Sequence, residues 1–298
     1  MTHDVIIVGG SYAGMAAALQ LLRARRSVLV VDAGQRRNRY ASHSHGFLGH
    51  DGADPAEIAR IARSQLEAYP TLSWIDGEAV SVGGQRDDFT VATDGKQTHH
   101  GRRLLLAVGV TDHLPQIEGL AERWGRTIFH CPYCHGYELN QRSIGVIGTG
   151  PMSLHQAELL TEWGNVTFLL NRALALDPQA RRNIEKRGAA IEEVTIERIE
   201  AEADVQLSDG RILSFAGLFT ATRVAPASRL PTEAGCEVDE TPMGQKIRTD
   251  ASRETTVPGI YACGDVAHMP HSVSLAVGDG AMAGAQLHRS LVWPDADV

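Results

Sequence analysis

The chain has 298 residues, of which 43% are hydrophobic and 21% are charged, and its formal net charge is −8 at pH 7. This composition excludes disordered and collagen-like classes, and the length allows two modest domains, each with a core of its own. The acidic balance argues against a nucleic-acid or anionic-membrane surface, because an acidic field repels phosphate polyanions. We therefore expect no nucleic acid and no membrane among the partners.

The first residues, MTHDVIIVGG, place Asp4 before an apolar run of only four residues. Such a run is too short and wrongly flanked for a signal peptide or a membrane span, so the sequence predicts a cytoplasmic protein. Thiols are kept reduced in that compartment, and a structural disulfide framework is not expected. We interpret Cys236 and Cys263 as small core residues, which leaves Cys131 and Cys134 as a close pair.

The chain opens with a strand, a glycine turn and a helix, written VIIVGG, SYAG and MAAALQLLRARR, and a second β-rich run follows as SVLVVDAG. The same pattern begins again at SIGVIGTG, passes through PMSLHQAELLTEW and returns as NVTFLLNR. We therefore predict an α/β fold with two Rossmann-like dinucleotide-binding domains of the three-layer ββα type, the second inserted in the first.

Between the two units, the stretches LSWIDGEAVSV, DFTVATDG and RRLLLAVG alternate in polarity and contain Asp-Gly turns, which predicts an antiparallel excursion on the first unit. The stretch AEADVQLSDGRILSFAGLFTAT is expected to close the second domain. The last block, from TTVPGIYACGDVAH to SVSLAVGDGAMAGAQLHRSL, is assigned to the first. The predicted domains are residues 1–112 plus 245–298, and residues 113–244.

The first turn, GGSYAG, has Gly9 and Gly14 where glycine lets the backbone approach a pyrophosphate, which the helix start attracts. Ser11 stands where the pattern usually has a further glycine, although its hydroxyl can itself bind a phosphate. Asp32 ends the second strand, where a carboxylate can accept hydrogen bonds from a ribose diol. The alternative is a tight turn that any parallel sheet needs, with Asp32 merely starting a loop.

The second turn, GTGPMS, keeps Gly148 and Gly150 but has Ser153 where helix and strand should pack most closely. No acidic residue stands at the end of the returning strand, FLLNR, so recognition of a 2′-phosphate would fall to Arg172. A nicotinamide site with these four residues is therefore one interpretation. The other is a domain that keeps the fold without the ligand.

The run CPYCHGYE separates Cys131 and Cys134 by two residues, a spacing at which two thiols can close a disulfide reversibly and carry two electrons. Zinc binding by this pair with His130 and His135 is disfavoured, because four ligands within six residues would strain tetrahedral geometry. His135 follows the second thiol, and with an ordinary pKa near neutrality it could move the proton of thiol–disulfide exchange.

Three further histidines, in the loop SHSHGFLGHDG, are interpreted as polar loop residues and not as a metal site; they are His43, His45 and His50. We expect no metal in this protein.

Taken together, GGSYAG, CPYCHGYE, GTGP and VPGIYACGDV resemble, in this order over nearly the whole chain, the low-molecular-weight thioredoxin reductase family. The resemblance implies FAD in the first site, with Gly264 and Asp265 holding the flavin side chain and pyrophosphate. It also implies that Cys134 faces the flavin as the charge-transfer thiolate and that Cys131 exchanges with the substrate. Further cofactor contacts implied by it are Tyr12, Ala13, Asn38, His45, Val80, Gly109, Ser272 and Val273.

Two departures bear on the reaction that the resemblance implies. His135 stands where thioredoxin reductases usually have Asp, and LLNRA stands where they have a paired-arginine motif for NADPH. Together with the segment RNRYASHSHGFLGHDG, these departures are similar to the branch of dithiol oxidases of disulfide natural products such as gliotoxin and holomycin.

The dithiol oxidase branch implies oxidation of a small-molecule dithiol, with oxygen as the acceptor and no need for NADP(H). The alternatives are NADPH-dependent reduction of a thioredoxin-like protein and a slow redox-sensing flavoprotein. A homodimer is expected from the resemblance alone.

Overall fold

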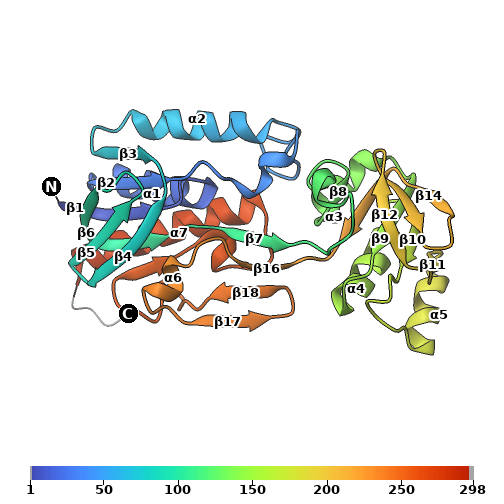
Figure 1. The fold of residues 1–298 in the computed structure, drawn as a ribbon. Helices are drawn as coiled ribbons and strands as arrows, with labels where there is room; N and C mark the ends of the chain where they lie inside the picture. The colour runs from blue at the N-terminus through green and yellow to red at the C-terminus, as the bar shows by residue number, and fades with distance from the viewer. Residues whose placement is uncertain (1, 295–298) are drawn as a thin grey trace. The chain divides into compact units, whose positions relative to one another are not determined.

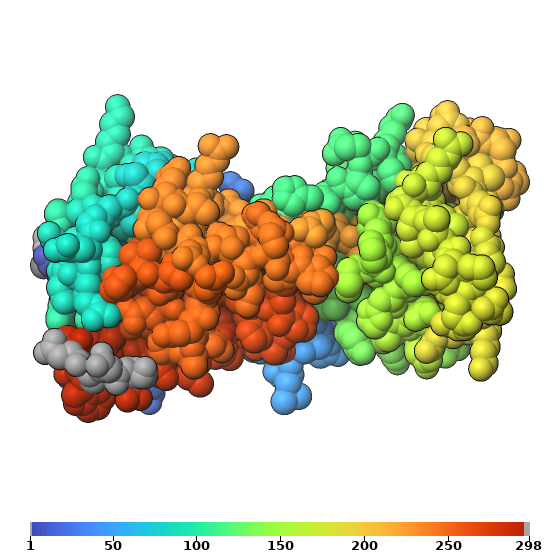
Figure 2. Space-filling model, turned by 90° about the horizontal axis from the view of Figure 1, so that it is seen from below, coloured from blue at the N-terminus to red at the C-terminus, as the bar shows by residue number. Residues whose placement is uncertain are grey.

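The computed structural model describes residues 2–294, which divide into two compact units. Unit 1 consists of Met1–Arg37, Asp54–Thr111 and Val224–Val298, and unit 2 consists of Asn38–Ala53 and Asp112–Arg223. The returning segment of unit 1, orange to red in Figure 2, covers much of the face of that unit seen from below. The second unit is therefore inserted into the first, as predicted.

Unit 1 is built on a seven-stranded sheet in the order β3-β2-β1-β6-β5-β4 (Figure 1). The seventh strand, β19, pairs with β6. The pairs among β1, β2, β3, β6 and β19 are parallel, whereas β4-β5 and β5-β6 are antiparallel. The strand bounds are β1 Thr2–Val8, β2 Val28–Asp32, β3 Leu72–Asp76, β4 Ala79–Gln85, β5 Asp88–Thr93, β6 Thr98–Leu106 and β19 Ile260–Ala262.

The main helices of unit 1 cover one face of this sheet, and β-structure covers the other. These helices are α1 Tyr12–Arg23, α2 Pro55–Glu67 and α7 Val273–Val292, with 3-10 turn η4 Gly264–Val266. The short helix α6 Leu230–Glu233 lies on the other face, where Leu230 is part of the core. Alternate residues of β1 point to opposite sides: Ile7 packs with α1, α2 and α7, and Ile6 packs with β5 and the returning segment. This is the predicted three-layer arrangement.

The predicted antiparallel excursion begins later than expected. Leu72–Asp76 is a further parallel strand beside β2, and only β4 and β5 form the excursion. The reason is helix α2, which the sequence pattern did not reveal: Asp54 caps its N-terminus by accepting from the Ala56 N–H at 2.7 Å. A helix between β2 and β3 makes their connection a crossover, which produces parallel pairing.

A four-stranded sheet, β17-β18-β16-β7, contains two of the four points at which the chain passes from one unit to the other, 111/112 and 223/224. Its strands are β7 Val110–His113, β16 Arg223–Pro226, β17 Val238–Thr241 and β18 Gly244–Ile247. Val224 and Ile247 are buried in the core of unit 1. The return therefore falls at residues 223/224 and not at 245 as expected, and residues 38–53 group with unit 2.

Unit 2 repeats the plan around a parallel sheet, β11-β10-β9-β15-β8, beside an antiparallel sheet, β12-β13-β14. The strands are β8 Ile128–Phe129, β9 Ser143–Ile147, β10 Asn165–Leu169, β11 Ala190–Glu192, β12 Ile196–Glu200, β13 Asp204–Leu207, β14 Ile212–Ser214 and β15 Gly217–Thr220. The helices are α3 Pro132–His135, α4 Pro151–Leu160 and α5 Pro178–Lys186, and the 3-10 turns of this part of the chain are η1 Arg37–Tyr40, η2 Ala121–Arg123 and η3 Tyr137–Leu139.

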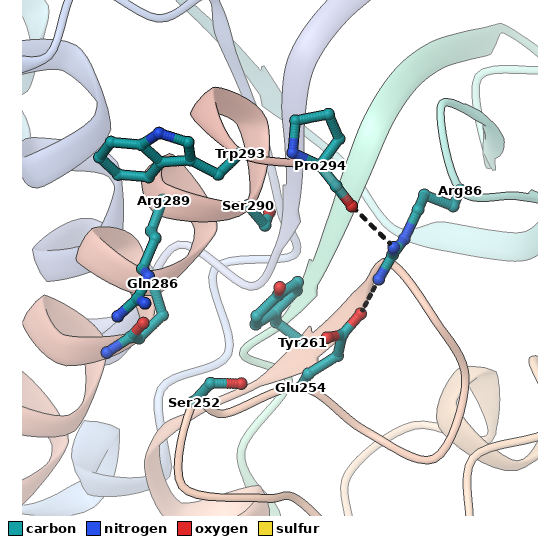
Figure 3. Close-up of a pocket in the computed structure, with 9 residues that line it drawn as sticks. All are labelled: Arg86, Ser252, Glu254, Tyr261, Gln286, Arg289, Ser290, Trp293 and Pro294. Carbon is teal, nitrogen blue, oxygen red and sulfur yellow. Dashed lines mark hydrogen bonds and ion pairs between the residues drawn. The ribbon is translucent and has the colours of Figure 1, made fainter. Parts of the chain in front are cut away.

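A small polar hollow in unit 1 lies at the C-terminal end of α7 (Figure 3). Its lining residues are Arg86, Ser252, Glu254, Tyr261, Gln286, Arg289, Ser290, Trp293 and Pro294. An α-helix rises about 1.5 Å per residue, so the part of α7 that lines the hollow lies roughly 20–30 Å along the helix from Ser272. The hollow is therefore separate from the cofactor contacts predicted at the start of α7.

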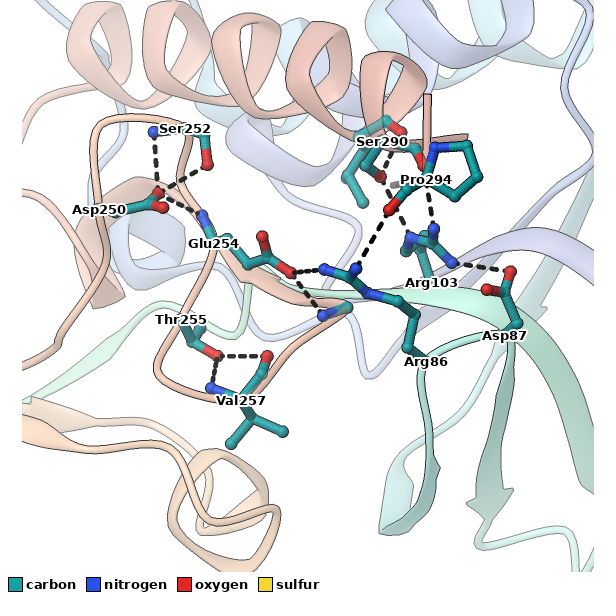
Figure 4. A network of polar contacts seen from close by, with 12 residues as sticks. Arg86, Asp87, Arg103, Asp250, Ser252, Glu254, Thr255, Val257, Ser290 and Pro294 are labelled. Carbon is teal, nitrogen blue, oxygen red and sulfur yellow. Dashed lines mark hydrogen bonds and ion pairs between the residues drawn. The ribbon is translucent and has the colours of Figure 1, made fainter. Parts of the chain in front are cut away.

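Polar contacts beside the hollow join the β4-β5 turn to the returning segment (Figure 4). Arg103, fully buried, donates to the Ser290 carbonyl at 3.0 Å and to Asp87 Oδ1 at 2.9 Å. Arg86 Nη2 donates to Glu254 Oε1 at 2.9 Å. The buried guanidinium of Arg103 is thus matched by acceptors, as burial of a charge requires.

None of the helices in residues 2–294 combines the length and the apolar composition needed to cross a bilayer.

Candidate active site

In the first glycine turn of unit 1, backbone segments lie so close together that only glycine fits. Gly9 has φ of +104°, and a Cβ on Gly14 would lie 1.9 Å from the Gly9 carbonyl oxygen, so neither position accepts a larger residue without a shift. Ser11 is the N-cap of α1 in an extended conformation, and its hydroxyl makes no capping hydrogen bond. The first N–H groups of an α-helix point away from its body and suit an anion, and α1 begins at Tyr12 and Ala13.

Asp32 lies beside this turn, as the motif predicted. Its Oδ1 accepts a hydrogen bond from the Gly10 N–H at 3.0 Å, which holds the carboxylate at the carboxyl end of β2. The second oxygen of the carboxylate is not used in that bond and can accept from a ribose hydroxyl. The role of Asp32 with a ribose stays a prediction.

The second predicted flavin-site motif packs against the first. A Cβ on Gly264, whose φ is +77°, would lie 2.7 Å from the Ala13 Cβ. Turn η4 therefore lies against the start of α1, and Asp265 in this turn accepts from Arg37 Nη1 at 3.2 Å. Segments about 250 residues apart in the sequence thus meet at one end of the sheet.

The start of α7 and two loops complete the predicted contacts in unit 1. Ser272 is the N-cap of α7, where its hydroxyl accepts from the Leu275 N–H at 3.1 Å, and Val273 begins the helix. Gly109 follows β6 with φ of +69°, and a Cβ at this position would meet no atom within 4 Å, so the backbone is open there. Val80 is half exposed in β4.

Asn38 and His45, the remaining two predicted cofactor contacts, group with unit 2 and not with the first glycine turn, which lies in unit 1. His45 Nδ1 lies 3.4 Å from Glu138 Oε1 and 3.7 Å from Asp51 Oδ1. Since Glu138 follows the Cys pair by only four residues, His45 is placed near the dithiol segment. No local pattern in the sequence pointed to this pairing.

The thiol pair is presented by a one-turn helix. Cys131 is the N-cap of α3 and Cys134 lies within it, with the Cys134 N–H donating to the Cys131 carbonyl at 3.3 Å. Residues three apart on a helical turn face the same side, so the turn brings the two side chains toward each other. Both residues are partly accessible. The geometry suits a pair that alternates between dithiol and disulfide.

His135 closes the same turn, and its ring stacks on Phe129 with centroids 4.3 Å apart and 17° between the ring planes. Burial, with a smaller contribution from His45, lowers the pKa of His135 to about 4. The expectation of an ordinary pKa near neutrality was therefore wrong, because an apolar neighbour disfavours the charged ring. At neutral pH the imidazole is uncharged.

The turn of the possible nicotinamide site is closed by its own side chains. Ser153 is fully buried, and its hydroxyl accepts from the Thr149 N–H at 2.9 Å and lies 3.0 Å from Thr149 Oγ1. A Cβ on Gly148 would lie 2.7 Å from the Leu170 carbonyl oxygen, whereas the space beside Gly150 is open. Ser153 thus serves the packing of the turn.

Arg172 follows β10 and is exposed, with φ of +56°. Its neighbour Asn171 uses Oδ1 to accept from the Ile196 N–H at 3.0 Å, so this side chain serves the fold. Gly148 and Gly150 thus follow β9, Ser153 lies in the first turn of α4, and Arg172 follows β10. Of the two polar side chains at the end of β10, Asn171 is occupied by the fold and Arg172 extends into solvent, where it could meet a ligand.

Cys236 and Cys263 are buried in the two cores of unit 1, which confirms their interpretation as core residues. Burial raises the pKa of both thiols. In the described chain, no group of three or more His, Cys, Asp or Glu side chains is arranged to hold a metal ion.

A family model for the pyridine nucleotide-disulphide oxidoreductases matches residues 3–280, nearly the whole chain. The chain belongs to this family. It is 32% identical to "Thioredoxin reductase tcpT" of Claviceps purpurea, over 97% of this chain and 94% of that protein. The predicted resemblance to thioredoxin reductase-like proteins is therefore confirmed.

Solved structures give the same result for the fold. An oxidoreductase from Agrobacterium tumefaciens is 52% identical, with a TM-score of 0.97 over 99% of this chain and 100% of that one. HlmI is 36% identical, with a TM-score of 0.91 over 99% and 94% of the two chains. The predicted α/β fold is confirmed.

As a thioredoxin reductase-like member of this family, the protein is a flavin-dependent disulfide oxidoreductase with FAD as its cofactor. The residues of unit 1 fit this group: the crowded Gly9 and Gly14, the uncapped start of α1 and the carboxylate of Asp32 together suit an adenosine diphosphate moiety. When bound, FAD supplies the two-electron acceptor for the thiol pair.

Proposed function

We propose that this enzyme oxidises a small-molecule dithiol to a disulfide through Cys131 and Cys134, with FAD and then oxygen as electron acceptors. The observation that carries the proposal is the second glycine turn, where Ser153 closes the turn on itself and the returning strand ends without a carboxylate. The second glycine turn thus offers few groups that could bind a nicotinamide dinucleotide. This favours a reaction in which the electrons come from the thiol substrate.

In this proposal, a substrate thiolate attacks the Cys131 sulfur of the protein disulfide, and Cys134 leaves as a thiolate. The second substrate thiol then attacks the substrate sulfur of the mixed disulfide, and Cys131 leaves. The substrate loses two electrons and two protons, and the protein pair gains the electrons. At the end of the cycle the bond between Cys131 and Cys134 forms again, and oxygen takes the two electrons and two protons and leaves as hydrogen peroxide.

We assign His135 to accept a proton from an attacking thiol. Because its pKa is about 4, the ring is neutral in the resting protein and has a free lone pair, but it holds a proton only transiently. His45, which also contributes to the lowered pKa of His135, lies 3.4 Å from Glu138. His135 is thus a transient proton acceptor and not a permanent cation that stabilises a thiolate.

The test is anaerobic reduction of the purified yellow protein, with NADPH, NADH and a small dithiol supplied in separate experiments. The proposal predicts that the dithiol bleaches the flavin absorbance within the turnover time and that neither nicotinamide does. Readmission of oxygen should restore the absorbance and release hydrogen peroxide in an amount equal to the reduced flavin. Rapid bleaching by NADPH would contradict the proposal.

The second candidate is NADPH-dependent reduction of a thioredoxin-like protein. The open space beside Gly150 and the exposed Arg172 favour it, since together they leave room and one cation for a nucleotide phosphate. Substitution Arg172→Gln separates the two functions: it should leave dithiol oxidation unchanged, and it should raise the KM for NADPH if the second candidate is correct.

We also propose a homodimer, as the family resemblance implies, located in the cytoplasm, as the N-terminal sequence predicts. Size-exclusion chromatography with light scattering tests the dimer, and a single-chain mass at micromolar concentration would contradict it.

A further inference from the structure

Asp279 is a buried carboxylate on α7 that belongs to none of the predicted cofactor contacts. Only 4% of its side chain is exposed, and it lies in the stretch GDGAMAG, where α7 packs against α1. A carboxylate is rarely buried unless it is paired and hydrogen-bonded, because desolvation disfavours its charge. Its partners therefore indicate what it holds in place.

The two oxygens of Asp279 have different partners. Oδ2 accepts from the Gly264 N–H at 2.8 Å, and Oδ1 accepts from Arg253 Nε at 2.5 Å. Gly264 begins turn η4, which contains Asp265, and its own carbonyl accepts from the N–H groups of Ala267 and His268 at 2.9 Å each. The Asp279 carboxylate thus holds the Gly264 N–H at the start of η4, and the Gly264 carbonyl accepts the hydrogen bonds that close this turn.

Arg253 is itself held in position by the loop before β19. Its φ is +70°, and the Asp250 carboxylate organises the loop by accepting from the N–H groups of Ser252 and Glu254 at 2.8 and 3.0 Å (Figure 4). The Arg253 carbonyl accepts from the Ala262 N–H at 3.0 Å. The cation is therefore preorganised to meet Asp279.

We propose that Asp279, paired with Arg253, is a positioning residue for FAD: it acts through the Gly264 N–H to set the place of Asp265 relative to the start of α1. The inference rests on the assignment of FAD to unit 1. Gly264 packs closely against Ala13, so a small displacement of η4 would also displace the start of α1. Both predicted phosphate-binding turns would then change position.

Two substitutions separate the two bonds of the carboxylate. Asp279→Asn keeps an oxygen for the Gly264 N–H and loses the charge that pairs with Arg253, whereas Asp279→Leu loses both and keeps the size of the side chain. We expect the dissociation constant for FAD to rise about 10-fold in the first variant and at least about 100-fold in the second. Arg253→Gln should raise the dissociation constant for FAD as much as Asp279→Asn does. A variant that combines these two substitutions should bind FAD no more weakly than the weaker-binding of the two single variants.

The measurement is release of FAD from the holoprotein, followed by flavin fluorescence, together with the shape and maximum of the visible flavin bands. If Asp279 had only a structural role, the variants would unfold at a lower temperature, but the flavin bands would not shift. FAD would also not bind more tightly to Asp279→Asn than to Asp279→Leu. Asp239→Asn is the matched control, since Asp239 pairs with Arg248 at 2.7 Å on the surface of the same unit. The control should retain FAD like the wild type.

Retention of FAD and unchanged bands in Asp279→Asn and Arg253→Gln would overturn the inference while leaving the proposed function intact. So would a loss of stability with unchanged FAD affinity of the folded fraction. If Asp279→Leu does not fold, the other two variants decide. A wild-type protein that does not bind FAD would overturn both the inference and the proposed function.

Discussion

The imidazole of His135 lies against the ring of Phe129, with centroids 4.3 Å apart and 17° between the planes. Phe129 ends β8 just before the thiol pair, and it also contacts Phe219 at a centroid distance of 5.6 Å. His135, which follows the second thiol, thus packs against the apolar core of unit 2. This contact explains why its ring stays neutral, and it limits the chemistry that His135 can perform.

The lowered pKa of His135 predicts an acid-dependent loss of stability. The group ionises near pH 6.5 when unfolded and near pH 4 when folded, so the unfolded state binds more protons between these values. Stability should therefore fall as the pH drops from 6.5 to 4, by at most about 3 kcal/mol from this residue. Urea unfolding at pH 7 and pH 5 checks it: His135→Gln should lose less stability over this interval than the wild type, and an equal loss would contradict the prediction.

Helix packing in unit 1 predicts opposite results at two glycines of α7. A Cβ on Gly280 would lie 2.1 Å from the Ala13 carbonyl oxygen, so Gly280→Ala should force the helices apart and destabilise the protein by about 3 kcal/mol. Gly278 has no atom within 4 Å of a Cβ, so Gly278→Ala is the control and should be neutral or stabilising by up to about 1 kcal/mol. Thermal unfolding of both variants tests the prediction, and equal effects would disprove it.

Ser153 is expected to matter for stability and not for turnover of a dithiol. Ser153→Ala removes the acceptor of the part-buried Thr149 N–H, which should cost about 1 kcal/mol of unfolding free energy. The rate of dithiol oxidation by the folded protein should stay within about twofold of the wild type, a difference of less than about 0.5 kcal/mol in the barrier. A large fall in kcat with unchanged stability would show that this turn participates in catalysis.

Local patterns were sufficient to predict the elements whose geometry depends on neighbouring residues. The turn GGSYAG, the position of Asp32 beside it and the close presentation of the thiols all follow from short-range steric rules. The pairing of Leu72–Asp76 was predicted wrongly because its alternating residues suit either sheet type, and only the preceding helix α2 decides for parallel pairing.

Features that depend on tertiary packing could not be predicted in the same way. The pKa of His135 depends on Phe129 and on a loop some ninety residues earlier in the chain. The return to unit 1 at Val224 depends on the pairing of β16 with β18. Asp279 did leave a signal, since it is a charged residue within a small-residue helix, but its partners lie 15 and 26 residues away.

The two thiols are expected to have separate roles, as the family resemblance implies. In Cys131→Ser, Cys134 remains and should give the long-wavelength absorbance of a thiolate beside an oxidised flavin. In Cys134→Ser this absorbance should be absent. Visible spectra of the two holoproteins at neutral and mildly alkaline pH provide the measurement, and the reverse pattern would exchange the roles of the two residues.

The central claim is that electrons pass from a substrate dithiol to FAD through Cys131 and Cys134. It is tested most directly by rapid anaerobic mixing of the holoprotein with a small dithiol, followed at the flavin absorbance maximum. The account predicts rapid bleaching in the wild type and a rate at least about 1,000-fold lower in both Cys131→Ser and Cys134→Ser. Bleaching of either variant at the wild-type rate would contradict it.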